Sequence, residues 1–342
     1  MVDYLKPWLW LPASTAHSLS PIMLQTLSRL RTRKRIVWES KKWRHLRFDN
    51  PLGISGGVDK NADMVRTWWR FGLGFVEVGT ITPRAQGPNP GKILDRRIRH
   101  HAVWNRMGFP SKGLSYAKAQ LTSLKQPHFT PIFANIGKNR ETPLRSAADD
   151  YIKCIRGLDG LVDGFVINIS SPNTSGLRNL LESTNLKNFM SPVVEANRDI
   201  RTTMGFPMPL ILKLSPDLDN EQLDQVLDVS IHYDIDGWVI SNTSTELYNH
   251  VGLPQEGGVS GQPLAEKAEG LLRKTIVALG DDRQDRLVVS SGGVMTPEDV
   301  FRRLQLGADL VQVYSTLIFN GPWFFCQTAK AYRSRNKAGK LQ

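Results

Sequence analysis

The chain of 342 residues contains only two cysteines, Cys154 and Cys326, and their positions match neither a redox pair nor a metal site. A disulfide between two isolated cysteines cannot be assigned without geometry, and this scarcity fits a reducing compartment. No apolar run approaches the roughly 20 residues that cross a bilayer. The N-terminus also lacks a basic stretch followed by an apolar core and a small-residue cleavage site. The sequence therefore predicts a protein that is neither transmembrane nor secreted.

Acidic residues are scarce relative to basic ones, and the imbalance is local. The net charge is +12, and residues 1–48 alone carry ten basic and two acidic residues, a net charge of +8. The basic residues of this segment are Lys6, Arg29, Arg31, Arg33, Lys34, Arg35, Lys41, Lys42, Arg44 and Arg47. Such a concentration of charge indicates an anionic partner for the N-terminal segment.

The same segment also carries apolar residues at helical spacing. They are Tyr4, Leu5, Trp8, Leu9 and Trp10, followed by Ile22, Met23, Leu24, Leu27 and Leu30. We expect two helices, the second capped by Ser14 or Thr15. Apolar faces beside dense basic charge favour an interfacial helix pair on an anionic membrane. Nucleic-acid binding is an alternative, although no recognition motif accompanies the charge, and a solvated helical hairpin packed on the main domain is another.

From residue 51 onward, short apolar stretches end in small or polar residues, and most are followed by helical stretches. Eight such stretches occur, at residues 52–55, 75–79, 132–135, 165–168, 210–213, 238–241, 287–290 and 310–313. Their alternation with helices predicts a parallel sheet, and eight units predict an α/β fold closed into a (β/α)8 TIM barrel. A doubly wound sheet is the alternative, but no Gly-x-Gly-x-x-Gly follows the first strand and the strand ends are polar all the way round. The segment 83–130 is too long for a simple βα unit, so we expect extra strands or a lid there.

Barrel enzymes carry their chemistry at the carboxyl ends of the strands, and here those ends are rich in amides and lysines. The amides are Asn135, Asn168, Asn173 and Asn242, and the lysines are Lys60 and Lys213. Any one of them could be structural, but together they are hard to explain as packing, because each would need a buried partner. The strand ends therefore predict a polar ligand site.

The densest group of polar residues is the stretch Asn168-Ile-Ser-Ser-Pro-Asn-Thr174, directly after the apolar run 165–167. An ordinary turn is the alternative reading of this stretch alone. Later in the chain, residues 257–261, 291–293 and 314–315 place glycines and hydroxyls after the last three strands. Loops after strands seven and eight commonly bind phosphate in barrel enzymes, so a phosphorylated cofactor fits.

These motifs resemble those of the dihydroorotate dehydrogenases, and specifically their membrane-associated, quinone-using class. The resemblance runs from about residue 47 to 325. It rests on the stretches Asn50–Gly53, Val58–Lys60, Gly79–Arg84, Asn105–Phe109, Asn135–Asn139, Asn168–Thr174, Gly257–Gly261 and Tyr314–Ser315. It implies a barrel over residues 47–342 that binds FMN and oxidises dihydroorotate to orotate. Residues 1–46, with Ala16-His17 ahead of an apolar helix, resemble the extension through which this class meets the membrane and its quinone. Peripheral membrane association would follow, on the cytoplasmic face of the inner membrane in a bacterium.

The resemblance also implies roles for individual residues. Ser171 would take the C5 proton of dihydroorotate as hydride leaves C6, and the proton would depart through water or Thr174, because no histidine is near in sequence. Lys213 would stabilise negative charge on the reduced flavin. Substrate contacts are implied for Lys60, Asn105, Arg106, Met107, Gly108, Phe109, Ser111, Asn168, Asn173, Asn242 and Thr243. Cofactor contacts are implied for Gly56, Gly57, Thr80, Asn135, Asn168, Lys213, Ser241, Gly261, Gly292, Gly293, Tyr314 and Ser315.

The sequence departs from the family pattern at two positions. Pro110 and Ser111 follow Phe109 where the class has an asparagine that binds substrate, so we expect Ser111 to replace that contact in part. An unmet amide partner would cost on the order of 1–3 kcal/mol. Asp95 stands where an aromatic residue is usual. A divergent FMN barrel with another ring substrate, or without dihydroorotate turnover, is therefore the alternative function.

Overall fold

The computed structural model describes residues 6–30, 35–124, 130–200, 205 and 207–339. Its centre is a closed parallel barrel of eight strands in the order β10-β12-β13-β3-β4-β7-β8-β9. The barrel strands are β3 (Leu52–Asp59), β4 (Phe75–Ile81), β7 (Ile132–Ile136), β8 (Gly164–Ile167), β9 (Leu210–Lys213), β10 (Gly237–Ile240), β12 (Leu287–Ser291) and β13 (Leu310–Val313). All eight expected strands are present, and the prediction of a (β/α)8 barrel is confirmed.

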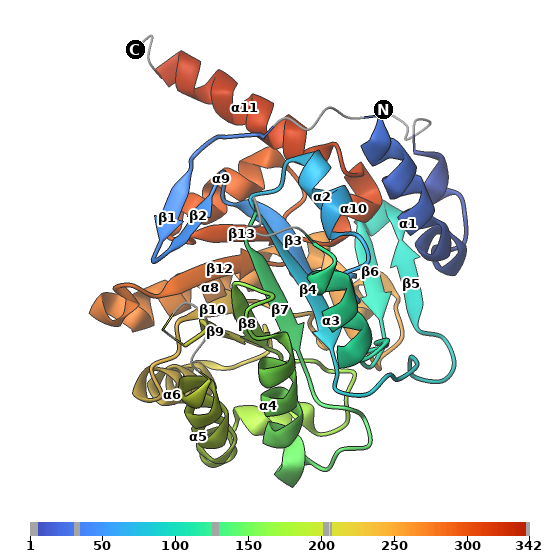
Figure 1. The fold of residues 1–342 in the computed structure, drawn as a ribbon. Coiled ribbons are helices and arrows are strands. Elements are labelled where there is room, and N and C mark those ends of the chain that lie inside the picture. Colours follow the sequence, from blue (N-terminus) through green and yellow to red (C-terminus); the bar gives the residue numbers. More distant parts are fainter. Residues whose placement is uncertain (1–5, 31–34, 125–129, 201–204, 206, 340–342) are drawn as a thin grey trace.

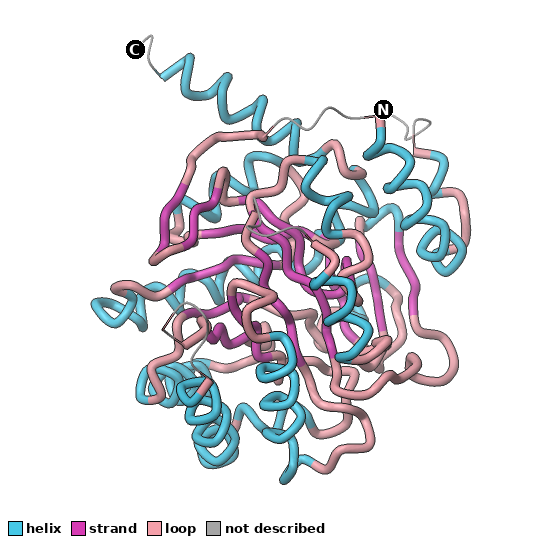
Figure 2. Tube along the Cα trace, in the orientation of Figure 1, coloured by secondary structure: helices cyan, strands magenta, loops and turns pink. Residues whose placement is uncertain are grey.

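Helices surround the barrel, shown as cyan tubes around the magenta strands in Figure 2. They are α2 (Val65–Phe71), α3 (Leu114–Thr122), α4 (Ala147–Leu158), α5 (Ser183–Asp199), α6 (Asn220–His232), α7 (Tyr248–Val251), α8 (Ala265–Leu279), α9 (Pro297–Gln305), α10 (Ser315–Asn320) and α11 (Phe324–Gly339). Short 3-10 turns cover η2 (Ile98–His100), η3 (Leu144–Ser146), η4 (Leu177–Leu181), η5 (Gln262–Leu264) and η6 (Gly280–Arg283).

Local sequence signals explain where several helices begin. Helix α6 starts with a capping box in which Asp219 accepts from the Gln222 amide at 2.8 Å and Gln222 accepts from the Asp219 amide. Helix α9 starts in the same way, with Thr296 and Asp299 as the reciprocal pair. Each such cap stabilises its helix by about 1 kcal/mol.

A hairpin closes the amino-terminal end of the barrel. It consists of the antiparallel strands β1 (Lys41–Trp43) and β2 (Leu46–Phe48), drawn in blue at the left of Figure 1. Phe48 is fully buried and lies 6.1 Å from Phe75 and 6.4 Å from Phe133, measured between ring centroids. The hairpin therefore fills the lower interior of the barrel, and the expected boundary after residue 46 falls inside β2.

Three further strands lie at the opposite end of the barrel. Strand β5 (Leu94–Arg97) and strand β11 (Gly258–Gly261) each pair antiparallel with β6 (Ala102–Asn105). Two of these strands come from the long segment 83–130, where extra strands or a lid were expected. The glycine-rich stretch that ends at Gly261 therefore forms β11 of this three-stranded sheet, and its buried Val259 packs with Trp104.

The N-terminal segment consists of η1 (Pro7–Leu9) and α1 (Ala13–Arg29), so the expected first helix is only one turn. Helix α1 lies at the right of Figure 1, beside α2 and β5. The prediction of a cap at Ser14 or Thr15 is wrong, because Pro12 occupies the N-cap position. Pro21 lies inside α1 and cannot donate to the His17 carbonyl, and the Ser20 hydroxyl donates to it instead at 2.8 Å. Asp3, Tyr4, Leu5, Arg31, Arg33 and Lys34 lie outside the described residues.

Much of the basic charge of residues 1–48 lies away from α1. Arg35 pairs with Asp49, Lys41 with Asp309, and Arg44 with Asp236. The latter two pairs tie the hairpin to acidic residues at the base of the barrel. Within α1 itself, Arg29 is the only Lys, Arg, Asp or Glu. Among the described helices, none is both long and apolar enough to cross a membrane.

Candidate active site

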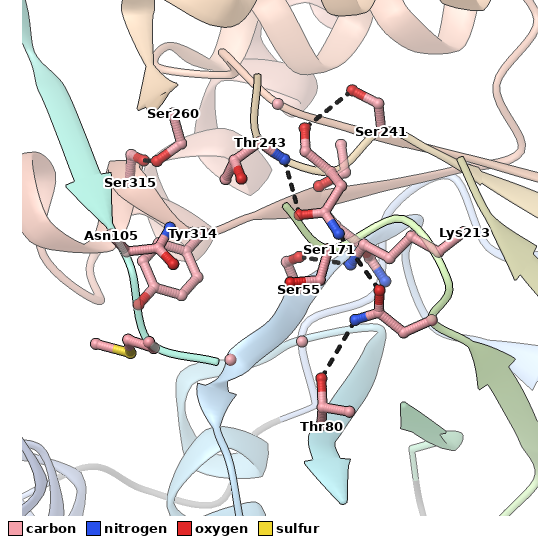
Figure 3. Close-up of a pocket in the computed structure, with 18 of the residues that line it drawn as sticks. Ser55, Thr80, Asn105, Ser171, Lys213, Ser241, Thr243, Ser260, Tyr314 and Ser315 are labelled. Atoms are coloured by element: carbon pink, nitrogen blue, oxygen red, sulfur yellow. Dashed lines mark hydrogen bonds between the residues drawn. The ribbon is translucent and has the colours of Figure 1, made fainter. Parts of the chain in front are cut away.

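A cavity opens at the carboxyl ends of the barrel strands, under the β5-β6-β11 sheet. Polar residues from many strand ends line it, including Lys60, Asn105, Asn168, Ser171, Asn173, Lys213, Asn242 and Thr243. Side chains from elements far apart in sequence point into the same space in Figure 3. The structure thus brings together most residues that the sequence singled out. These include Gly56, Gly57, Thr80, Met107, Gly108, Phe109, Ser241, Gly261, Gly292, Gly293, Tyr314 and Ser315.

Below the cavity, the upper interior of the barrel is polar and is centred on Glu77 of β4. This carboxylate is fully buried and accepts hydrogen bonds from Asn135 Nδ2 at 2.6 Å and from Gln312 Nε2. Lys213 Nζ forms an ion pair with it at 3.1 Å and also donates to Ser55 Oγ at 3.3 Å. Lys213 lines the cavity, whereas Glu77 does not. The ammonium is therefore held between the carboxylate and the cavity.

Ser171 lies on the loop after β8, and its side chain is buried at the cavity wall. Its hydroxyl oxygen accepts from the Asn173 amide at 3.2 Å. Asn173 Nδ2 donates to Asn105 Oδ1 at 2.9 Å, while Asn173 Oδ1 has no hydrogen-bond partner among the described residues. The nearby Thr174 hydroxyl is also buried and has no partner in the described part of the chain. This wall therefore offers a hydroxyl and an amide to a bound molecule.

Three predicted site residues do not line the cavity. Arg106 Nη1 pairs with Glu256 at 2.8 Å. Asn135 lies beneath the floor between Glu77 and Thr80. The Ser111 hydroxyl accepts from the backbone amides of Thr82 and Gly113, and the Ser111 backbone pairs with Gln86. The structure therefore does not support Ser111 as a replacement for the missing asparagine, and Pro110 lines the cavity there.

The opposite end of the cavity is built from backbone and hydroxyl groups. Gly261, Gly292, Gly293 and Ser315 meet there, and the Ser260 and Ser315 hydroxyls lie 2.9 Å apart. A Cβ atom at Gly293 would lie 2.1 Å from the Ala265 Cα, so only glycine fits. The fully buried Arg303 fixes the backbone on two sides of this end. Its Nη2 donates to the Ala265 carbonyl at 2.8 Å and to the Gly292 carbonyl at 3.2 Å.

Sequence reasoning missed several residues of this site. Besides Glu77, they are Ser55, Leu264, Val294, Gln312 and Val313, whereas Ser260 and Ser291 belong to stretches that the sequence had already indicated. Glu77 and Gln312 carried a usable signal, because each interrupts an otherwise apolar strand with a polar side chain. Burial of such a group requires partners, and the ends of the other strands supply them.

A second cavity of about 310 Å³ lies beside the first and is mostly apolar. Helix α1 contributes Ala13, Ala16, His17, Ser20, Pro21, Met23, Leu24 and Leu27 to its lining. Gly57, Lys60 and Tyr314 line both cavities. The two spaces therefore meet at these three residues.

Two charged groups stand at the edge of the second cavity. Arg96 Nη2 donates to the Trp8 carbonyl at 3.1 Å and the Leu9 carbonyl at 2.8 Å, which fastens η1 to β5. Asp95 Oδ2 forms ion pairs with Lys92 Nζ and Arg97 Nη1, each at 2.8 Å. Desolvation opposes the charged form of Asp95, but these hydrogen bonds hold its pKa below the usual value.

Lys60 at the junction and its neighbour Asp59, which lines the second cavity, both have shifted pKa values. Burial raises the pKa of Asp59 to about 7, and its carboxylate accepts from the Met64 amide at 3.0 Å. Desolvation lowers the pKa of Lys60 to about 8, while Asp59 opposes this shift. Lys60 Nζ donates to the Gly57 carbonyl at 2.9 Å. The charge of Lys60 is therefore sensitive to mildly basic pH.

These features define a (β/α)8 barrel with a ligand site at the carboxyl ends of its strands, where barrel enzymes carry their active sites. The family model for dihydroorotate dehydrogenase matches residues 39–334. The chain belongs to the dihydroorotate dehydrogenase family, a family of oxidoreductases.

Individual relatives agree with this assignment. A dihydroorotate dehydrogenase (quinone) from Thermus thermophilus is 41% identical over 280 residues, which cover 81% of this chain and 77% of the relative. A second, from Stenotrophomonas maltophilia, is 36% identical over 296 residues, or 86% and 83% of the two chains. The crystal structure of a DHODH from Eimeria tenella in complex with ferulenol has a TM-score of 0.84 at 28% identity. It covers 95% of this chain and 92% of that one.

Proposed function

We propose that this protein oxidises dihydroorotate to orotate in pyrimidine biosynthesis, with FMN as its cofactor and a membrane quinone as the final electron acceptor. The observation that carries this proposal is the meeting of a polar and an apolar cavity at Gly57, Lys60 and Tyr314. A polar ring acid fits the polar cavity, and a lipid-soluble quinone fits the apolar cavity. The substrate and the quinone could then reach one cofactor from two different sides.

The residues around the polar cavity fit a flavin. Gln312 Oε1 is buried, lacks a partner among the residues that the structure describes, and belongs to a residue that lines the cavity, so it fits a ring N–H donor. A Cβ at Gly56 would lie 2.4 Å from Glu77 Oε1, so glycine there brings the backbone close to the floor. Gly261, Gly292, Gly293 and Ser315 would hold the phosphate. Bound FMN would accept hydride from the substrate and pass electrons to the quinone.

Ser171 is the proposed base, since its buried hydroxyl lies on the cavity wall. A serine is weakly basic, so burial and orientation must assist the proton transfer. The Thr174 hydroxyl is buried without a partner in the described chain, and it is available to carry the proton onward. Lys60 would hold the substrate carboxylate, and Asn105, Asn173, Asn242 and Thr243 would contact the carboxylate and ring amides. Lys213 would stabilise negative charge that develops on the flavin.

The apolar cavity beside α1 is the proposed quinone site. Trp10, Leu19 and Ile22 are exposed on the N-terminal segment, with 66%, 49% and 67% of their surfaces accessible. These side chains fit contact with the acyl chains of a membrane, while Met23, Leu24 and Leu27 of the same helix line the cavity. We propose peripheral association through this segment, on the cytoplasmic face of the inner membrane if the protein is bacterial.

Anaerobic addition of dihydroorotate to the flavin-loaded protein tests the reaction. Rapid bleaching of the flavin absorbance is the expected result, followed by recovery on addition of a quinone. Absence of bleaching while FMN stays bound would contradict dihydroorotate oxidation. It would favour a different ring substrate, for which Pro110 at the cavity wall in place of an amide would be the structural reason.

A further inference from the structure

Glu77 is the only group beneath the cavity floor that receives hydrogen bonds from three barrel strands, as judged within the described residues. The donors are Asn135 of β7, Lys213 of β9 and Gln312 of β13. An ionised carboxylate can only accept hydrogen bonds. Both amides must therefore turn their nitrogen toward Glu77 and their oxygen away from it.

This orientation continues from amide to amide around the barrel. Asn135 Oδ1 accepts from Asn168 Nδ2 at 3.0 Å, and Asn168 Oδ1 accepts from Asn242 Nδ2 at 3.4 Å. Asn242 Oδ1 then accepts from the Thr243 amide at 2.8 Å. Every bond in this series has its donor on the side away from Glu77. Because each amide has one donor end and one acceptor end, reversal of one would place like groups against each other.

The second branch from Glu77 ends at the cavity. Gln312 Nε2 donates to Glu77 Oε2, so Gln312 Oε1 must face the other way. That oxygen is buried and has no partner in the part of the protein that the structure describes, and the residue lines the cavity. Glu77 thus makes Gln312 an acceptor on its ligand side, although Glu77 itself does not reach the cavity.

We propose that Glu77 is a positioning residue that sets the donor and acceptor pattern of the amides around the cavity, and that it moderates the positive charge of Lys213 toward the bound cofactor. This inference rests on the proposed function, because it concerns the same flavin and substrate. It assigns Glu77 two separable effects. One is on the orientation of Gln312 and of the series Asn135, Asn168 and Asn242, and the other is on the electrostatic potential at the flavin.

Glu77→Gln tests both effects with almost no change in volume. The new amide presents one donor to the cluster, so the three donors Asn135, Lys213 and Gln312 no longer all find an acceptor. Loss of the carboxylate also leaves the Lys213 ammonium less compensated, which favours the reduced flavin. We expect a positive shift of the flavin midpoint potential and a loss of orotate affinity of roughly tenfold or more.

The midpoint potential is measured by equilibration with reference dyes, and orotate binding by the change in flavin absorbance. Asp150→Asn is the matched control, because Asp150 is a buried carboxylate on α4 that accepts from the Asn139 amide and the Thr142 hydroxyl, away from the cavity. Neither quantity should change in that control. Glu77→Asp, which keeps an acceptor-only group, should shift the potential less than Glu77→Gln does.

An unchanged potential together with unchanged orotate affinity in Glu77→Gln would overturn the proposal. If that variant fails to retain flavin, Gln312→Met decides the orientation branch, because it keeps Glu77 and removes the proposed acceptor Oε1 together with the Nε2 donor to Glu77. A loss of FMN affinity of about tenfold is expected, and unchanged FMN affinity would overturn that branch. Dye equilibration needs no dihydroorotate, so failure of the proposed reaction would be recognised separately, by the absence of bleaching in the unmodified protein.

Discussion

Ser171 carries the proton transfer in the proposed reaction, and its substitution is the most direct test at the scale of single residues. Ser171→Ala should retain FMN, because the hydroxyl's only hydrogen bond among the described residues is the one it accepts from the Asn173 amide. Flavin reduction by dihydroorotate should fall by roughly 10² to 10⁴, the usual contribution of a positioned base. Stopped-flow absorbance after anaerobic mixing measures this rate. Reduction at the unmodified rate would exclude Ser171 as the base.

Lys213 should control the electron affinity of the flavin. Lys213→Met retains the length of the side chain and removes the ammonium that lines the cavity, so the reduced flavin would lose its proposed positive partner. The midpoint potential should become more negative, the opposite of the shift expected for Glu77→Gln. A variant that binds FMN with an unchanged potential would show that Lys213 is not beside the flavin.

The lowered pKa of Lys60 predicts a pH dependence of substrate binding. Below a pKa of about 8 the ammonium is charged and would attract the substrate carboxylate in the proposed site, and above it this attraction would be lost. The affinity of the oxidised protein for orotate should therefore decrease as the pH rises through about 8. Lys60→Arg is the control, because a guanidinium stays protonated over the whole range. Titrations at intervals between about pH 6 and 10 measure the effect, and equal affinity at both ends would contradict it.

At the scale of elements, the N-terminal segment differs most from its prediction. The sequence predicts an apolar helix in this segment, and α1 is that helix. It also predicts that the basic residues share the surface of this helix. Lys41 and Arg44 pair with Asp309 and Asp236, which are more than 190 positions away in sequence. Charge composition could not reveal these pairs, since they exist only after the barrel has closed.

The outer face of α1 is where membrane binding should be tested. Leu19→Gln combined with Ile22→Gln removes two exposed apolar side chains that do not line the second cavity, the proposed quinone site. Binding to liposomes should weaken by roughly tenfold or more, since a buried aliphatic side chain contributes about 1.5–3 kcal/mol. Val277→Gln on α8, which removes an apolar side chain that is 81% exposed, is the control.

Sedimentation with liposomes of anionic and neutral lipids measures this binding. Reduction of the flavin by dihydroorotate should stay normal in the double variant. Turnover with a long-chain quinone should fall together with liposome binding. Equal sedimentation of the double variant and the unmodified protein would show that α1 is only a structural cover of the cavity.

At the scale of the whole molecule, the barrel could be predicted because the sequence pattern that specifies each strand is short and occurs eight times. Eight apolar stretches with polar ends predict both the fold and the side of the sheet that carries the ligand, and Asn168, Lys213 and Asn242 lie there as expected. Glu77 could not be assigned a role in this way, because its partners come from three other strands. The surroundings of Ser111 could not be predicted for a related reason, since its hydroxyl accepts from backbone amides that only the folded loop brings near.

The shared boundary of the two cavities has a consequence for how the proposed enzyme would respond to its own products. Orotate would leave toward water and quinol toward the lipid, so neither product has to pass through the space of the other reactant. Accumulated orotate should then compete with dihydroorotate and leave the quinone step untouched. In a cell, the concentration of orotate and the redox state of the quinone pool could then vary separately. The two half-reactions would influence each other only through the oxidation state of the buried cofactor.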